Sequence, residues 1–363
     1  MISSIYWGLA IFVLVFWVRA EPGDSRYFKT IMFFYAAFGS MFLPKTRESI
    51  YISVFTGIAF IWIFLFPMAH TGVAWKSIVV LASVLLFSKL YTSKDSFDVD
   101  ILKDLLALAC IGQAIWIFIN YLGFDPAGWF GIMRRMAGGD SISRINMRVA
   151  GSLDNIMVSA NFLALTFPFL IRRDWVLFIP CVLVVVVISE SATGILGIGI
   201  SIAAYLFYSK EYRALATYLI LGAVAAFVLY DPRFMSPGSR TQVWVESLGI
   251  WFKSGLSSQL FGFGPGIFKH FIRKLLSTKE VFSHPHNEYI SILFQFGIVG
   301  LGIFLGGIWK ALRGKDPHFQ SALCVLLLTM MSAFPLHIAS TGVISILILV
   351  FCIDFQSDRM LKY

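Results

Sequence analysis

The chain has 363 residues, of which 58% are hydrophobic and only 13% are charged, and its formal net charge is +9. Soluble globular domains are about half apolar and a quarter charged, so this chain carries more apolar surface than a water-soluble fold can bury. The composition excludes a soluble enzyme, a disordered protein and a nucleic-acid-binding domain. Apolar stretches that are continuous rather than alternating disfavour a β-barrel. We therefore expect an all-α, polytopic integral membrane protein whose surroundings are a lipid bilayer.

A membrane-spanning helix needs about 20 predominantly apolar residues. The apolar stretches predict about twelve such helices within a single membrane domain, 1–363. Their approximate ranges in chain order are 2–18, 30–44, 49–69, 72–90, 104–123, 152–171, 175–190, 192–209, 213–230, 287–309, 319–336 and 338–355. The first range lacks the basic segment and cleavage site of a signal peptide, which predicts an uncleaved helix.

Lysine and arginine in short loops predict the orientation of the chain. With both termini in the cytoplasm, the inner side holds 14 of the 29 basic residues and the short outer loops hold four. The other eleven lie in two longer outer segments, 124–150 and 231–286. Basic loops at a membrane face are typical of an anion site, although attraction to anionic lipid headgroups explains them too. Those used below are Arg134, Arg135, Arg144, Arg148, Arg240, Arg273 and Lys274.

The longer outer segment, 231–286, has internal helical patterning. Apolar residues recur at helical spacing from Trp244 to Phe252, which predicts one short amphipathic helix, and 269–276 predicts a second. Between them, 260–266 reads LFGFGPG, a tight turn that lacks the strand and helix of a dinucleotide-binding fingerprint. We interpret 231–286 as a loop with interfacial helices that covers a membrane-embedded cavity.

Three of the six histidines lie at the end of this segment, at positions 270, 284 and 286. Histidine is the side chain best suited to proton transfer near neutral pH. The alternatives are helix capping, contact with headgroups, or a zinc site at His284 and His286. Zinc is disfavoured because no third ligand follows at a usual spacing. The four cysteines lie inside apolar runs, which predicts small buried side chains rather than disulfides or metal ligands.

Three sequence motifs together resemble those of the bacterial O-antigen ligases and the related O-antigen polymerases. His286 and Asn287, followed after nine residues by GIVG at 297–300, fit the pattern H-[NSQ]-x9-G-x-x-[GTY]. The stretch RVAGSLDN at 148–155 resembles the family's R-x-x-G-x-x-x-N segment. Ser239, Arg240 and Trp244, followed by LFGFGPG, resemble its S-R-x-x-x-W and glycine-rich loop. One departure is SESATG at 189–194, where related sequences often carry Ser-Arg.

The resemblance implies a membrane glycosyltransferase of the GT-C type in the bacterial inner membrane, with its active site facing the periplasm. Its substrates would be an undecaprenyl-diphosphate-linked glycan donor and a glycan acceptor, and it would need no metal or other cofactor. A chain-length regulator is left open as a further partner. The stretch Asp98-Val99-Asp100 imitates a metal-binding DxD motif, but it falls on the predicted cytoplasmic side, and we interpret it as a solvated loop.

Roles for individual residues follow from the resemblance together with their chemistry. His286 would be the general base, and Arg148 and Arg240 would hold the diphosphate, because the planar guanidinium group makes paired hydrogen bonds to phosphate. Other residues are candidates for contacts with the diphosphate or the glycan. For Glu190 two interpretations stay open: it orients an arginine, or it faces water at its turn. These candidates are Arg134, Arg135, Arg144, Arg273, Lys274, His284, Asn287 and Glu190.

The function predicted first is that of an O-antigen polymerase, which joins lipid-linked repeat units with inversion at the anomeric carbon. The alternative within the same class is an O-antigen ligase, which transfers the finished glycan to lipid A–core. The motifs do not separate the two, and polymerase is preferred because the outer loop is compact. A transporter of lipid-linked glycans is the alternative from another class, disfavoured because the chain shows no internal repeat.

Overall fold

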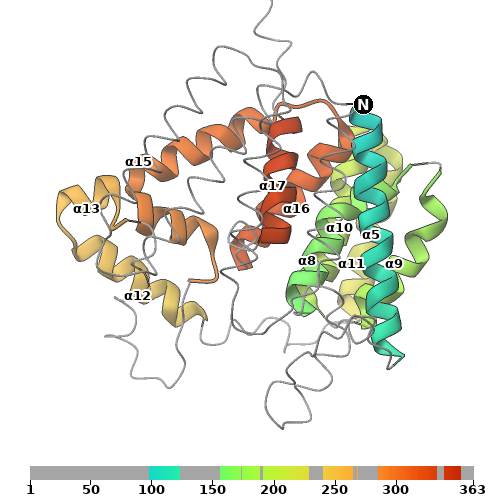
Figure 1. Ribbon diagram of the computed structural model, residues 1–363, viewed down its shortest axis with the longest axis horizontal. Coiled ribbons are helices and arrows are strands. Elements are labelled where there is room, and N and C mark those ends of the chain that lie inside the picture. The colour runs from blue at the N-terminus through green and yellow to red at the C-terminus, as the bar shows by residue number, and fades with distance from the viewer. Residues whose placement is uncertain are drawn as a thin grey trace, which may run out of the picture.

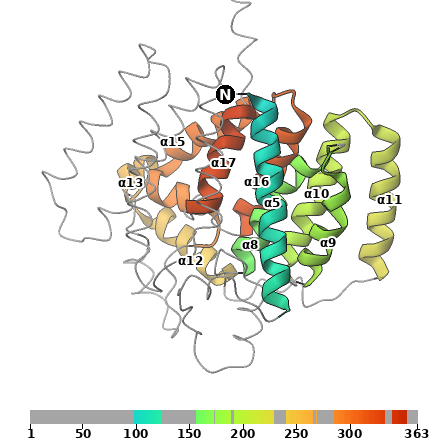
Figure 2. The ribbon, with the colours of Figure 1, turned by 45° about the vertical axis from the view of Figure 1, so that its right-hand side comes forward.

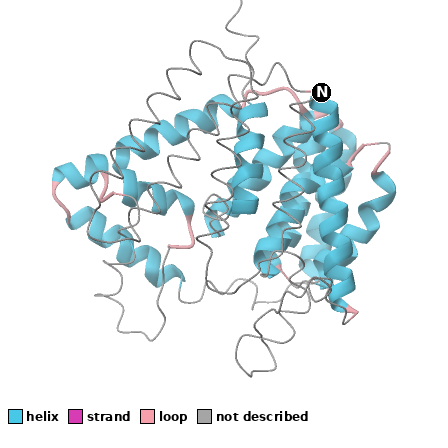
Figure 3. Ribbon diagram, viewed as in Figure 1, coloured by secondary structure: helices cyan, strands magenta, loops and turns pink. Residues whose placement is uncertain are grey.

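The computed structural model describes residues 98–122, 156–172, 174–188, 191–228, 240–264, 268, 285–332 and 339–352. Throughout these ranges the regular elements are helices, and no strand occurs in them (Figure 3). The prediction of an all-α protein is therefore confirmed for the part of the chain that the structure describes.

Eight of the predicted spans fall on described residues, and each coincides with helical structure. The corresponding elements are α5 (Val99–Tyr121), α8 (Ile156–Thr166) with η3 (Phe167–Leu170), η4 (Val176–Phe178) with α9 (Ile179–Ile188), α10 (Ala192–Tyr208), α11 (Tyr212–Val228), α15 (Glu288–Ala311), α16 (Pro317–Ser332) and α17 (Ala339–Cys352). The spans predicted at 2–18, 30–44, 49–69 and 72–90 lie outside the described residues. Among the described helices, α5 and α15 have the length and hydropathy needed to cross a membrane, so the total of about twelve stays a prediction.

The main bundle is built around α8, which packs against α5, α10, α16 and α17 (Figures 1 and 2). Its contact with α10 is close because small residues face each other. A Cβ atom built on Gly194 would lie 2.8 Å from Cβ of Ala160, and one on Gly197 would lie 2.7 Å from Cβ of Ala164. Small residues of this kind let helix backbones approach in membrane proteins, where dispersion contacts replace the hydrophobic effect as the main attraction.

Buried polar side chains link the helices of this bundle in pairs. Nε2 of Gln113 on α5 donates to Oγ of Ser159 on α8 over 3.1 Å, and Oγ of Ser321 on α16 donates to the Ser201 carbonyl of α10 over 2.6 Å. All four residues are less than 1% exposed. Such bonds add about 0.6–2 kcal/mol each between membrane helices, and they fix the register of one helix against the next.

The four cysteines differ in their surroundings. Cys110 and Cys352 are buried in the bundle, as expected for small apolar side chains, and Cys324 is partly buried. Cys181 is exposed on α9, so the prediction of burial was wrong there. The cause is that an apolar run in a membrane protein includes a face that is turned away from the bundle, and hydropathy does not separate the two faces.

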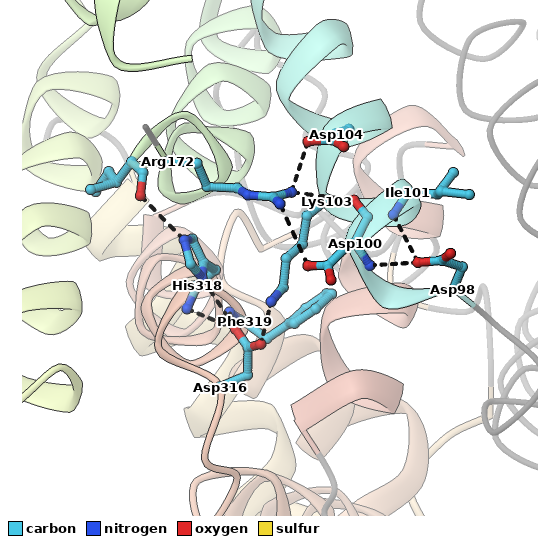
Figure 4. Close-up of polar contacts among 10 residues, drawn as sticks. Asp98, Asp100, Ile101, Lys103, Asp104, Arg172, Asp316, His318 and Phe319 are labelled. Atoms are coloured by element: carbon cyan, nitrogen blue, oxygen red, sulfur yellow. Dashed lines mark hydrogen bonds and ion pairs between the residues drawn. The ribbon is translucent and has the colours of Figure 1, made fainter. Parts of the chain in front are cut away.

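A charged cluster lies at the end of the bundle where α5 and α16 begin (Figure 4). Arg172 donates to Asp104 over 2.7 Å, Trp175 donates to the same carboxylate oxygen over 2.9 Å, and Nζ of Lys103 lies 2.5 Å from the carboxylate of Asp316. The cluster ties the loops before η4 and α16 to the first two turns of α5. The charge analysis predicts that this end faces the cytoplasm.

The interpretation of Asp98-Val99-Asp100 as a solvated loop was right about exposure, since both aspartates are exposed, but wrong about the loop, because α5 begins at Val99. Asp98 is the N-cap of α5, and its side chain accepts hydrogen bonds from the backbone N–H groups of Asp100 and Ile101. Asp100 lies in the first turn of the helix, 3.5 Å from the guanidinium of Arg172. Carboxylates at these positions stabilise a helix through its orphan N–H groups and its dipole, which accounts for the spacing of the two aspartates without a metal.

Asp316 gives this cluster a dependence on pH. Burial alone raises the pKa of its carboxyl, but hydrogen bonds from His318 and Lys103 and the charge of Lys103 outweigh burial and hold that pKa below its usual range. A carboxyl with a lowered pKa adds stability above its ordinary pKa of about 4. That stability is lost as the pH falls below this value toward the lower pKa of the folded protein.

Replacing Asp316 with asparagine is therefore expected to lower the free energy of unfolding by about 1–3 kcal/mol near pH 7, because Lys103 loses its partner. On acidification below about pH 4 the stability of the unaltered protein should fall more steeply than that of the variant. Thermal unfolding in detergent, followed by tryptophan fluorescence across this range, measures both effects. Parallel curves for the two proteins would contradict the role given to this carboxylate.

Candidate functional site

The motif residues around His286 meet two short helices of the 231–286 segment. These are α12 (Arg240–Lys253) and α13 (Leu256–Phe261), and both pack beside α15 (Figure 1). The amphipathic helix predicted around 244–252 is thus confirmed as α12. The second helix, predicted over 269–276, lies outside the described residues.

An apolar cluster separate from the main bundle joins α12 to α15. Val243, Phe268 and Phe294 are each no more than 2% exposed and pack together. The Phe294 ring has its centroid 4.6 Å from that of Phe263 and 5.2 Å from that of Phe268. Aromatic contacts of this kind add about 0.5–1.5 kcal/mol beyond the area that they bury. The glycine-rich loop and α12 are therefore held against the first half of α15.

The α15 helix is broken at Gly297, whose φ of 67° and ψ of −167° are not helical. The break releases backbone acceptors, and the glycine-rich loop uses them. The N–H of Phe263 donates to the Phe294 carbonyl over 2.9 Å, and the N–H of Gly264 donates to the Gln295 carbonyl over 3.0 Å. The uninterrupted helix predicted over 287–309 was wrong in this respect, because the partners of the broken turn lie about 31 residues earlier in the sequence.

Two glycines make this contact possible by bringing one backbone onto another. A Cβ atom on Gly262 would overlap the carbonyl of Gln295, and one on Gly297 would overlap the carbonyl of Leu260. Both residues also have positive φ, 80° and 67°, and the φ and ψ of Gly297 lie in a region that is essentially restricted to glycine. The family-like glycine motifs thus have a structural role here: they allow a loop to dock into a helix break.

His286 lies immediately before the first half of α15 and has a left-handed backbone, with φ of 53°. This conformation costs a residue with a side chain about 1–2 kcal/mol, and it persists only where the surrounding structure holds it. Two groups do so. The indole N–H of Trp244 on α12 donates to the carbonyl of Pro285 over 2.6 Å, and Asn287 caps α15 by accepting from the N–H of Ile290 over 3.1 Å.

Asn287 also connects this turn to the main bundle. Its Nδ2 donates to the carbonyl of Met331, at the end of α16, over 3.2 Å. The side-chain amide was predicted to contact the substrate. In the structure the amide nitrogen and the amide oxygen each have a backbone partner. A contact with substrate stays a prediction.

The first half of α15 carries buried polar side chains on one face. Glu288, Ser291 and Gln295 are at most 6% exposed, and Nε2 of Gln295 donates to Oγ of Ser291 over 2.7 Å. The Glu288 carboxylate lies in the first turn, where the helix dipole favours a negative charge. The segment that follows His286 therefore has a buried polar face.

The structure describes part of the predicted site. It places His286 and Asn287 at the start of α15, and it places the backbone of Arg240 at the start of α12. The other predicted site residues lie outside the described residues: Arg134, Arg135, Arg144, Arg148, Glu190, Arg273, Lys274 and His284. Sequence analysis did not include Trp244 among the site residues. Its place in the S-R-x-x-x-W motif was the signal that could have identified it.

Comparison with known protein families gives one match within this region. The model of a family described as O-antigen ligase matches residues 176–305, from η4 to the second half of α15. The matched segment includes α12, α13, the glycine-rich loop and His286. It supports the O-antigen ligase and polymerase superfamily that the motifs predicted. No curated protein matches the chain.

Proposed function

We propose that this chain, whose residues 176–305 match the O-antigen ligase family, is an O-antigen polymerase of the inner membrane. It would join undecaprenyl-diphosphate-linked oligosaccharide repeat units at the periplasmic face. The observation that supports this proposal is the position of His286, a proton acceptor fixed before a broken helix inside the matched segment. A histidine held in a strained backbone by two neighbouring elements is typical of a functional position.

In the proposed reaction, His286 accepts the proton of a sugar hydroxyl on the acceptor. The hydroxyl oxygen then forms a bond to the anomeric carbon of the donor sugar, and the bond from that carbon to the diphosphate oxygen breaks. Undecaprenyl diphosphate leaves with the bonding electron pair. A single displacement of this kind inverts the anomeric configuration. Positioned general-base catalysis contributes about 10²–10⁴-fold in rate.

Arginine would stabilise the leaving diphosphate in place of a metal ion. Arg148 and Arg240 are proposed as the main contacts, and the other basic candidates are Arg134, Arg135, Arg144, Arg273 and Lys274. These contacts strengthen as negative charge collects on the leaving group, and losing one such donor costs about 10²–10³-fold in rate. Arg240 begins α12, the same helix that holds Trp244 against Pro285, which supports placing the diphosphate near His286.

The test uses purified protein in detergent with the lipid-linked repeat unit extracted from a producing strain that lacks this chain. Such a strain accumulates its own substrate, so the sugar need not be known in advance. A ladder of longer glycans on a gel, formed without another acceptor, supports the polymerase. Product that forms only after lipid A–core is added would instead establish a ligase. No product under either condition from folded protein would overturn both proposals and favour the transporter.

A further inference from the structure

The indole of Trp244 connects α12 to the turn that carries His286. Its N–H donates to the carbonyl of Pro285, the residue before the histidine, over 2.6 Å. We propose that Trp244 is a positioning residue that fixes the imidazole of His286 through this backbone bond. The proposal rests on the proposed function, in which His286 accepts a proton.

The link from Trp244 to His286 follows from peptide geometry. The Pro285 carbonyl and the His286 N–H belong to the same rigid peptide unit, so a donor that fixes the carbonyl also fixes the plane from which φ of His286 is measured. On the other side, the cap made by Asn287 fixes the following residue. With both neighbouring units held, φ of His286 stays at 53° and the side chain has one direction of departure from the backbone.

The α12 helix is suited to transmit this constraint because it is itself anchored. Val243, the neighbour of Trp244, is 1% exposed and packs with Phe294 of α15. Trp244 therefore belongs to a helix that is already packed against α15, and it holds the turn just before α15. Through the shared helix, the position of His286 is also coupled to Arg240 at the start of α12.

Trp251 provides a matched control on the same helix. It is 8% exposed and packs edge-on against Phe252 with ring centroids 4.9 Å apart. Within the described part of the chain its indole N–H has no hydrogen-bond acceptor. Replacing either tryptophan with phenylalanine removes a similar apolar volume, but only at position 244 does it remove a hydrogen bond.

The experiment compares the unaltered protein with Trp244→Phe and Trp251→Phe. The first readout needs no substrate: the rate at which diethyl pyrocarbonate modifies His286, measured by mass spectrometry over a range of pH, with His284 separated by fragmentation. We expect Trp244→Phe to change this rate about 3-fold or more, the size expected from losing one ordinary hydrogen bond, and Trp251→Phe to leave the pH profile unchanged. Identical profiles in all three proteins would overturn the proposal.

The second readout is turnover of the lipid-linked repeat unit. Misplacement of a catalytic group by about 1 Å can cost about 100-fold in rate, so Trp244→Phe is expected to lower kcat about 10- to 100-fold with KM little changed. Trp251→Phe should keep the kcat of the unaltered protein. Equal losses of kcat in both variants would overturn the proposal, since packing alone would then explain the effect.

Two provisions cover a variant that does not fold and an unaltered protein that shows no activity. If Trp244→Phe does not fold, a benzothienyl analogue of tryptophan at position 244 retains the shape of the indole and removes only the N–H, and the same expectations apply to it. If the unaltered protein forms no glycan, the proposed function fails while the modification rates still decide whether Trp244 positions His286. Failure of the two ideas is therefore seen in different measurements.

Discussion

Replacing His286 with alanine is expected to lower the rate of glycan transfer at least 100-fold, because the attacking hydroxyl loses its proton acceptor. The variant should fold because the imidazole is only partly buried. The substitution also leaves in place the hydrogen bonds that Asn287 makes to α15 and α16. Product formation from the lipid-linked repeat unit, measured at equal protein concentration, checks the expectation.

A second histidine serves as the control for this variant. His318 lies in the charged cluster at the start of α16, 3.4 Å from Asp316, and its Nε2 lies 3.3 Å from the carbonyl of Ile171. We expect His318→Gln to change thermal stability while keeping turnover. Wild-type turnover in His286→Ala would remove the histidine from the mechanism.

Replacing Gly297 with alanine is expected to destabilise the protein by about 3 kcal/mol or more, because the residue has a backbone conformation essentially restricted to glycine and its Cβ would overlap the Leu260 carbonyl. The break in α15 and the docked loop should be lost together. Thermal unfolding and limited proteolysis of the 240–264 segment, both in detergent, measure the two effects.

The same helix supplies matched controls for this glycine. Nothing lies within 4 Å of a Cβ atom built on Gly302 or Gly306, and both residues continue α15 after the break. Gly302→Ala and Gly306→Ala are expected to be neutral or to stabilise the protein by about 0.5–1 kcal/mol through helix propensity. A Gly297→Ala protein as stable as these controls would show that the break does not depend on glycine.

Hydropathy was enough to predict the eight apolar spans that fall on described helices, because the length of an apolar run reports burial in lipid or protein directly. The short helix α13 was not predicted. It could not predict the break at Gly297, which depends on acceptors freed within α15 and donors supplied by Phe263 and Gly264. It also could not predict that Cys181 is exposed, since an apolar run does not state which of its faces packs inward.

The sequence likewise predicted some contacts of the candidate site and missed others. His286 and Asn287 were found because their spacing to the following glycines resembles a family motif, and the family match covers both residues. The bond from Trp244 to Pro285 was not predictable, because its acceptor is a backbone carbonyl and every residue has one. Contacts between a side chain and a distant backbone leave little trace in a single sequence.

The break in α15 has a consequence for how the protein is made. The stretch 288–311 is continuous in hydropathy and is long enough to be recognised as one segment during membrane insertion. The donors that divide it belong to a loop that the ribosome has already synthesised. We therefore expect the segment to insert as one helix and to be divided afterwards, so that the proposed site around His286 forms only when the preceding loop has folded onto it.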